Sequence, residues 1–88
     1  MRLKQREKRE LRDAFKRELG ARLALALADE RMRQRELASE LGSGSADVCE
    51  WIHGRREPGA WVIAMCVKLL PSTNVEWLLT GEGPRWKK

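Results

Sequence analysis

Apolar residues recur at helical intervals along most of this chain, and glycine or proline separates the segments that carry them. The clearest case lies between residues 34 and 54, where two short inward stripes are predicted: Leu37, Ala38 and Leu41, followed by Val48, Trp51 and Ile52. Gly42, Ser43 and Gly44 stand between the stripes, and the glycines allow the backbone to turn sharply. The pattern predicts two short amphipathic helices joined by a tight corner.

Two further segments precede this pair. The stretch from Leu3 to Leu19 is rich in good helix formers, and the stretch from Ala21 to about Asp29 is apolar almost all round. Leucine and phenylalanine recur every four residues from 11 to 27, in a row that drifts by about 40° per step on a straight helix. We therefore expect a break or bend at Gly20. Residues 3–19 form either an extra helix, continuous or nearly so with the next, or a frayed basic arm.

The second half of the chain predicts two more helices. Pro58 and Gly59 signal a turn, after which Ala60 to Leu70 reads as an apolar helix. Pro71 ends it, and Asn74 is a good N-cap for a last helix with the sequence VEWLL. The fold class predicted is all-α, a compact five-helix bundle with an additional N-terminal helical segment. The tryptophans expected to anchor its core are Trp51, Trp61 and Trp77.

Composition narrows the possible functions. The 88 residues suffice for one domain, and no apolar run approaches the roughly 18 residues that cross a bilayer, so we expect a cytoplasmic protein without a membrane partner. Cys49 and Cys66 are expected to be free thiols, and the single histidine, His53, has no neighbours at metal-ligand spacing. No nucleophile with a base and no phosphate-binding glycine loop appears. We expect no enzyme activity, no metal, no cofactor and no small-molecule ligand.

The charge of the chain is uneven. Its net charge of +5 suits a polyanionic partner. Residues 1–18 hold eight basic and four acidic side chains, whereas residues 42–57 hold two basic and three acidic ones. The basic residues therefore gather towards the ends, and the second helix of the predicted pair is slightly acidic.

The order Gln34, Leu37-Ala38, Leu41-Gly42, a turn, Val48 and Trp51 resembles the Cro/repressor-type helix-turn-helix domains of phages and bacteria. Gly54 with Arg55 and Arg56, the segment AWVIAMCVKLL and the segment NVEWLLTGEG continue the resemblance over roughly residues 19 to 84. It implies a helix-turn-helix domain at 19–84, preceded by a basic helical extension or an arm that orders on DNA at 1–18. A basic tail follows at 85–88, in which Trp86 has no assigned place.

The resemblance implies a sequence-specific transcriptional regulator, a phage or mobile-element repressor that binds double-stranded DNA as a homodimer. The helix that starts at Ser45 would read the major groove. Ser45, Ala46 and Glu50 match base-reading positions, and Gln34 matches a position that meets a phosphate. The other residues expected at the DNA are Arg33, Arg35, Gly44, Cys49, His53, Arg55 and Arg56.

Other interpretations of these residues stay open. Glu50 is as well suited to a salt bridge with Arg55 or Arg35 as to a cytosine, and Asp47 is expected to stabilise the helix N-terminus. Cys49 is a minor candidate for a redox switch. A repressor-like domain that binds a protein instead of DNA is the second class of function, since the reading helix is acidic and the N-terminal Leu/Phe row could dock a partner.

Overall fold

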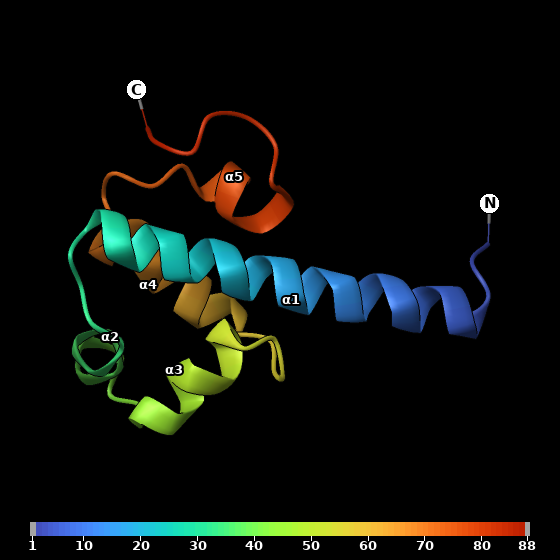
Figure 1. The fold of residues 1–88 in the computed structure, drawn as a ribbon, viewed down its shortest axis with the longest axis horizontal. Coiled ribbons are helices and arrows are strands. Elements are labelled where there is room, and N and C mark those ends of the chain that lie inside the picture. Colours follow the sequence, from blue (N-terminus) through green and yellow to red (C-terminus); the bar gives the residue numbers. More distant parts are fainter. Residues whose placement is uncertain (1, 88) are drawn as a thin grey trace.

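The computed structural model describes residues 2–87 and confirms the all-α fold (Figure 1). Within this range the chain forms five helices and no strand, apart from an isolated β-bridge between Thr73 and Trp86. The helices are α1 (Gln5–Asp29), α2 (Gln34–Leu41), α3 (Ser45–Ile52), α4 (Ala60–Leu69) and α5 (Val75–Thr80). Figure 1 shows α1 passing between α5 on one side and α2 and α3 on the other, with α4 behind it.

The expected break at Gly20 is wrong, because α1 runs through this residue without interruption. A Cβ atom built on Gly20 would lie 2.3 Å from the carbonyl oxygen of Trp51 and 2.5 Å from that of Ile52. The glycine therefore serves close packing: it lets the last turn of α3 rest on the backbone of α1. The missing side chain is required by the close packing of α3.

A second glycine completes this crossing from the other side. Gly54 follows α3 with a φ of 73°, a left-handed conformation, and a Cβ on it would lie 2.8 Å from Cα of Arg17. Arg17 and Gly20 are almost one turn apart on α1. The end of α3 is thus held against α1 by backbone-to-backbone contact at both residues.

The core lies where the inner faces of the helices meet. It is built from α1 (Leu19, Leu23, Ala26, Leu27), α2 (Leu37, Ala38, Leu41), α3 (Val48, Trp51), α4 (Val62, Cys66), and Leu70 and Leu78. Both stripes that the sequence predicts for α2 and α3 face this core, with Ile52 only partly buried. Trp51 is buried as expected, and Trp77 packs against the core while partly exposed.

Trp61, which was expected in the core, and Leu25 of the apolar part of α1 are exposed. Trp61 keeps 58% of its surface, because Val62 and Cys66, one turn apart, are the α4 residues that face inward. Leu25 of the segment ARLALALA keeps 44%, because α1 is covered by neighbours over only part of its circumference. The segment that is apolar almost all round in sequence is therefore buried on only some of its faces.

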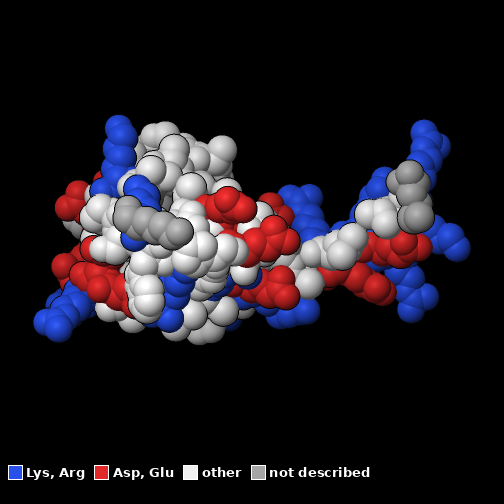
Figure 2. All heavy atoms as spheres, turned by 90° about the horizontal axis from the view of Figure 1, so that it is seen from above, with Lys and Arg blue, Asp and Glu red and all other residues white. Residues whose placement is uncertain are grey.

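The N-terminal part of α1 extends beyond the rest of the molecule (Figure 1). Residues 2–13, here called the overhang, are all exposed, and Leu19 is the first buried side chain of the chain. Of the two alternatives for this segment, the structure has the helix continuous with the next one. Figure 2 shows acidic side chains among basic ones along the overhang, as seen from the α5 side.

Candidate nucleic-acid interface

The corner between α2 and α3 is formed by backbone geometry. Gly42 has a φ of 67°, and this left-handed residue directs its own N–H to Ala38 and Ser39 carbonyls at the end of α2. The N–H of Ser43 also bonds to the Ala38 carbonyl, at 2.9 Å. The chain then leaves α2 at once, and α3 begins at Ser45. The two helices pack closely, in the arrangement that the Gly-Ser-Gly segment predicts.

The outward face of α3 is not covered by other described parts of the chain. Ser45, Ala46 and His53 are exposed, and Cys49 and Glu50 are partly exposed. Gly44, the residue that precedes the helix, is exposed and has open space around its Cα. The residues predicted to read bases thus share one accessible helix face, opposite the buried Val48 and Trp51.

Ion pairs hold both acidic residues of α3. The Glu50 carboxylate accepts a hydrogen bond from Arg55 Nε, and Asp47 Oδ1 lies 3.4 Å from Arg56 Nη1. The Glu50 carboxylate raises the pKa of the Arg55 guanidinium, first through the hydrogen bond and then through its charge. Arg55 and Arg56, two of the four arginines expected at the DNA, therefore have carboxylate partners in the free protein. The pair of Glu50 with Arg55 corresponds to the salt-bridge interpretation of Glu50.

Cys49 and His53 face each other one helical turn apart. The Cys49 Sγ lies 3.4 Å from the His53 Nδ1, and the same nitrogen lies 2.8 Å from the Cys49 carbonyl oxygen. Arg55 Nη2 lies 3.9 Å from the sulfur. The contacts place both side chains beside the Glu50–Arg55 pair. In contrast, burial raises the pKa of the Cys66 thiol in α4 to about 11, which makes it a weak nucleophile near neutral pH.

The start of α2 forms the other edge of the interface. Arg33 is the N-cap residue, where the resemblance leads one to expect Ser or Thr, and its guanidinium has no acceptor atom. The Glu36 carboxylate accepts the Arg33 N–H at 3.1 Å and so supplies half of a capping box. Arg33, Gln34 and Arg35 are all exposed. Three polar side chains therefore surround this helix end, as the sequence predicts.

One contribution to this surface was missed in the sequence. Arg12 on the overhang donates two hydrogen bonds to the Glu57 carboxylate, at 2.5 and 3.2 Å, and the pair raises the pKa of Arg12. Arg12 and Lys16 line a shallow groove together with Arg56, Glu57, Pro58 and Gly59. The recurrence of Lys8, Arg12 and Lys16 at every fourth position is the signal that could have shown a basic stripe on α1.

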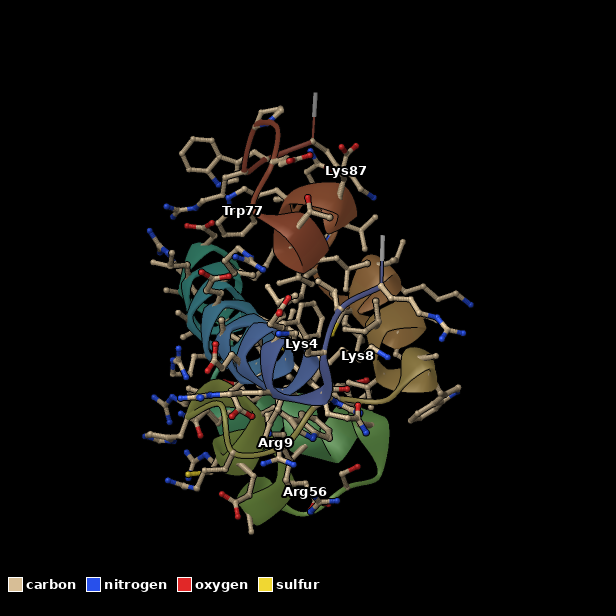
Figure 3. All side chains as sticks on the ribbon, turned by 90° about the vertical axis from the view of Figure 1, so that its right-hand side faces the viewer. Lys4, Lys8, Arg9, Arg56, Trp77 and Lys87 are labelled. Carbon is tan, nitrogen blue, oxygen red and sulfur yellow. The ribbon has the colours of Figure 1, made fainter. Side chains whose placement is uncertain are left out.

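Figure 3 looks along α1 from its N-terminal end. In this projection Arg9 lies below the axis of α1, on the side of α3, and Arg56 lies below Arg9. Lys8, Arg9 and Arg12 also line a depression on the overhang itself. Arg12, through its pair with Glu57, is the residue that joins the overhang to the segment after α3.

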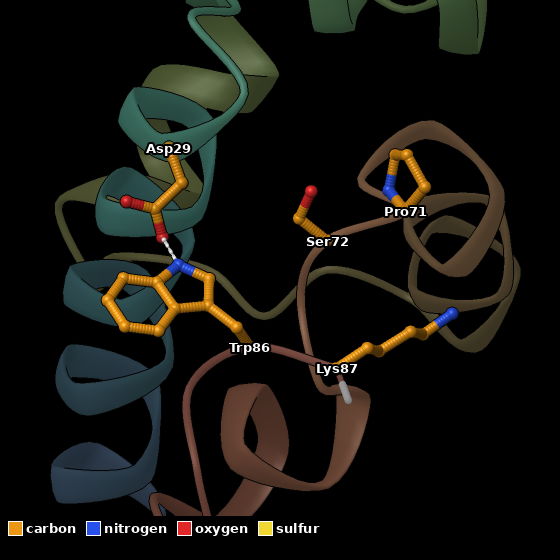
Figure 4. Close-up of a pocket in the computed structure, with 5 residues that line it drawn as sticks. All are labelled: Asp29, Pro71, Ser72, Trp86 and Lys87. Carbon is orange, nitrogen blue, oxygen red and sulfur yellow. Dashed lines mark hydrogen bonds between the residues drawn. The ribbon is translucent and has the colours of Figure 1, made fainter.

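The basic C-terminal segment packs against the end of α1, away from α3. Arg85 Nε and Trp86 Nε1 donate to Asp29 Oδ2 at 2.8 and 3.0 Å, and the Trp86 contact is drawn in Figure 4. The Arg85 guanidinium lies 4.8 Å from the centre of the Trp86 ring. Trp86, which the sequence leaves unplaced, borders a surface depression with Pro71, Ser72 and Lys87. Its contacts hold the C-terminal segment in position.

Comparisons with protein-family models, with curated proteins and with solved structures give no match. Among residues 2–87, no group of three or more His, Cys, Asp and Glu side chains is placed to hold a metal ion. None of the helices described combines the length and apolar character needed to cross a membrane.

Proposed function

We propose that this chain binds double-stranded DNA and regulates transcription, with the outward face of α3 in the major groove. The observation that carries the proposal is the open face of α3 at a sharp corner with α2, where Ser45 and Ala46 stand exposed in the first turn. A helix fits the major groove, and base edges are read by side chains near its start. The resemblance to Cro/repressor-type domains supports the same placement.

Phosphate contacts would come from both sides of α3. Gln34, Arg33 and Arg35 lie at the start of α2, and Arg55 and Arg56 follow α3. On DNA, Arg55 and Arg56 would exchange their carboxylate partners for phosphates, so that binding includes the breaking of two exposed ion pairs. Such exposed pairs contribute little to stability in water, so the exchange is inexpensive.

The resemblance extends the proposal to a phage or mobile-element repressor that binds as a homodimer to a palindromic site. With about four to six phosphates per subunit, the logarithm of the binding constant should fall with the logarithm of salt concentration at a slope of about −4 to −5. A selection of bound sequences from random duplexes near physiological salt tests the proposal. Enrichment of a palindromic sequence supports it, and recovery of unenriched sequences contradicts it.

Glu50→Ala separates base reading by Glu50 from its ion pair with Arg55. A Glu50 that accepts from a cytosine would lose about 1–3 kcal/mol of discrimination at one base pair when truncated. Affinity for unrelated sequences should not fall, because Arg55 is released towards phosphate. The measurement is a fluorescence-anisotropy titration with the selected duplex and with its single-base variants.

Glu40→Ala is the matched control, since Glu40 is an exposed carboxylate on α2 and forms no ion pair with the described residues. This variant makes the same change in net charge and should leave the base preference unaltered. An unchanged preference in Glu50→Ala would show that Glu50 holds Arg55 and reads no base. The proposal for α3 would then depend on Ser45 and Ala46.

Binding to another protein is the second candidate, and the exposed Trp61 favours it. This residue keeps 58% of its surface on α4, and the neighbouring Ala64 and Val67 are exposed as well. Exposed apolar patches mark sites of protein association. A chain that selects no DNA sequence, yet forms a complex abolished by Trp61→Ser, would support this candidate against DNA binding.

A further inference from the structure

The charges of the overhang are segregated around the helix. At about 100° per residue, Lys8, Arg9 and Arg12 fall on the side of α1 that carries Leu19, Leu23 and Leu27 further along. Glu7 and Glu10 fall on other sides, and Figure 2 shows acidic side chains on the face seen from α5. The stripe of α1 that is apolar inside the bundle therefore becomes basic where the helix leaves it.

Lys8 and Arg9 are the available cations of this basic face. Both are exposed, and neither has a carboxylate within 4.0 Å in the part of the chain described. Arg12, by contrast, is engaged by Glu57, Lys16 lies 3.4 Å from Asp13, and the two arginines after α3 pair with acidic residues of α3. Lys8 and Arg9 can thus meet an anionic partner without first losing a protein contact.

The basic face is joined to the proposed DNA interface. Arg12 pairs with Glu57, and Arg12 and Lys16 share a groove with Arg56, two residues after Gly54 at the end of α3. Figure 3 shows Arg9 on the same side of α1 as Arg56, whereas Lys8 lies on the side of α4. A single polyanion that occupies α3 would therefore continue along this groove towards the overhang.

The dimensions of DNA fit this placement. Packed helices lie about 8–10 Å apart, and the major groove is about 8.5 Å deep. When α3 sits on the floor of the groove, the phosphates that border the groove rise to about the level of α1. Lys8 is twelve residues from Gly20, a distance of about 18 Å along the helix, which corresponds to about five base pairs of duplex.

We infer that Lys8, Arg9 and Arg12 of the overhang bind the DNA backbone that flanks the segment read by α3. This inference rests on the proposed function and adds a second contact region to it. The flanking contact is electrostatic and independent of base sequence, because lysine and arginine on an exposed helix face neutralise phosphates. It would lengthen the bound duplex on the side of the overhang.

The double variant Lys8→Gln/Arg9→Gln tests the inference. Glutamine retains good helix propensity, and circular dichroism verifies that α1 is intact. Salt titrations by fluorescence anisotropy use the duplex selected for α3, in one form trimmed to the site and in another extended by about one helical turn on each side. On the extended duplex the salt slope should fall by about 2, with about tenfold weaker binding or more near 0.1 M salt.

The trimmed duplex should bind the double variant and the unaltered chain with similar affinity. Lys68→Gln/Lys87→Gln is the matched control, because it removes the same charge outside the overhang: Lys68 is exposed on α4, and Lys87 lies by Asp29 and Pro71. It should leave the extended duplex bound nearly as before. These three results together support the flanking contact.

Other results would overturn it. Equal losses in both double variants would show an effect of net charge alone. An unchanged slope in Lys8→Gln/Arg9→Gln would show that the overhang does not bind the DNA backbone. Binding to vesicles with anionic lipid that depends on Lys8 and Arg9, with DNA binding unaffected, would assign the overhang to a membrane surface. If the unaltered chain binds no duplex, the proposed function itself fails, and the flanking contact fails with it.

Discussion

Gly20 determines how closely α1 and α3 approach each other. The atoms that a Cβ would meet are the carbonyl oxygens of Trp51 and Ile52, which belong to the backbone and cannot move aside as a flexible side chain would. Alanine is the better helix former by about 1 kcal/mol in an exposed helix interior. At this position, the steric cost exceeds that gain.

Gly20→Ala should therefore lower the free energy of unfolding by about 1–3 kcal/mol, the usual cost of overpacking a core. Urea denaturation followed by circular dichroism measures the change. Gly59→Ala is the control, since Gly59 has open space around it, and its loss at an N-cap should cost about 0.5 kcal/mol. A more stable Gly20→Ala variant would contradict the close contact between α1 and α3.

At the level of helices, α5 is the element that most needs outside support. It has six residues, too few for a helix that is stable alone. The Arg22 guanidinium from α1 donates to the carbonyl oxygens of Leu78 and Leu79 at 2.8 and 3.1 Å, while Asn74 caps the other end. Because these carbonyls have no intrahelical partner at a helix C-terminus, Arg22 fixes α5 to α1.

Arg22→Lys tests this role of the guanidinium. Lysine keeps the positive charge but loses the planar pair of donors, so one charge-assisted hydrogen bond is lost and stability should fall by about 1–2 kcal/mol. Thermal and urea denaturation measure it. Arg6→Lys, on the exposed overhang, should change stability by less than about 0.5 kcal/mol. Equal effects of the two changes would argue against a specific cap on α5.

Helix positions were predictable from the sequence because periodicity, capping residues and glycine are local signals. The corner after Leu41 and the N-cap at Asn74 are examples. The interpretation of Gly20 failed because its partner, the end of α3, lies some thirty residues away along the chain. Trp61 was misplaced because α4 is apolar on several sides, and only the packing of neighbours selects the buried one.

The candidate site could likewise be predicted where its residues are close in sequence, and not where they are distant. The stripe on α3 and the alternative pairing of Glu50 with Arg55 could be predicted, since these residues are near in sequence. The pair of Arg12 with Glu57 could not, because 45 positions separate them. The association of the overhang with the segment after α3 is therefore a result of tertiary structure alone.

Across the whole molecule, the C-terminal segment returns to the end of α1. The N–H of Asn74 bonds to the Arg85 carbonyl and that of Lys87 to the Ser72 carbonyl, both at 2.9 Å. The carboxylate of Asp29, the last residue of α1, accepts hydrogen bonds from the side chains of Arg85 and Trp86. A carboxylate at a helix C-terminus is unfavourable, so the guanidinium neutralises a charge that the helix dipole opposes. Hydrogen bonding from Arg85 lowers the pKa of Asp29, and the Trp86 N–H acts in the same direction.

This contact predicts a pH dependence of stability. The folded state lowers the pKa of Asp29, so the carboxylate contributes its full stabilisation of the fold above about pH 4, the ordinary pKa of a carboxyl group. This stabilisation is lost as the pH falls through the lower pKa of the folded state. Asp29→Asn should be less stable than the unaltered chain at neutral pH, with a difference that shrinks in acid. Urea denaturation at a series of pH values measures it. Asp13→Asn is the exposed control, and a difference for Asp29→Asn that is constant with pH would contradict the role of its charge.

The glycine crossing of α1 and α3 also has a mechanical consequence. Main-chain atoms meet there, so the closest approach of α1 to α3 is set by backbone atoms and not by a flexible side chain. Exchanges of similar volume among the buried leucines would then alter how firmly the molecule holds together while leaving the overhang aimed as before. The angle between the two helices could persist through extensive divergence of the interior.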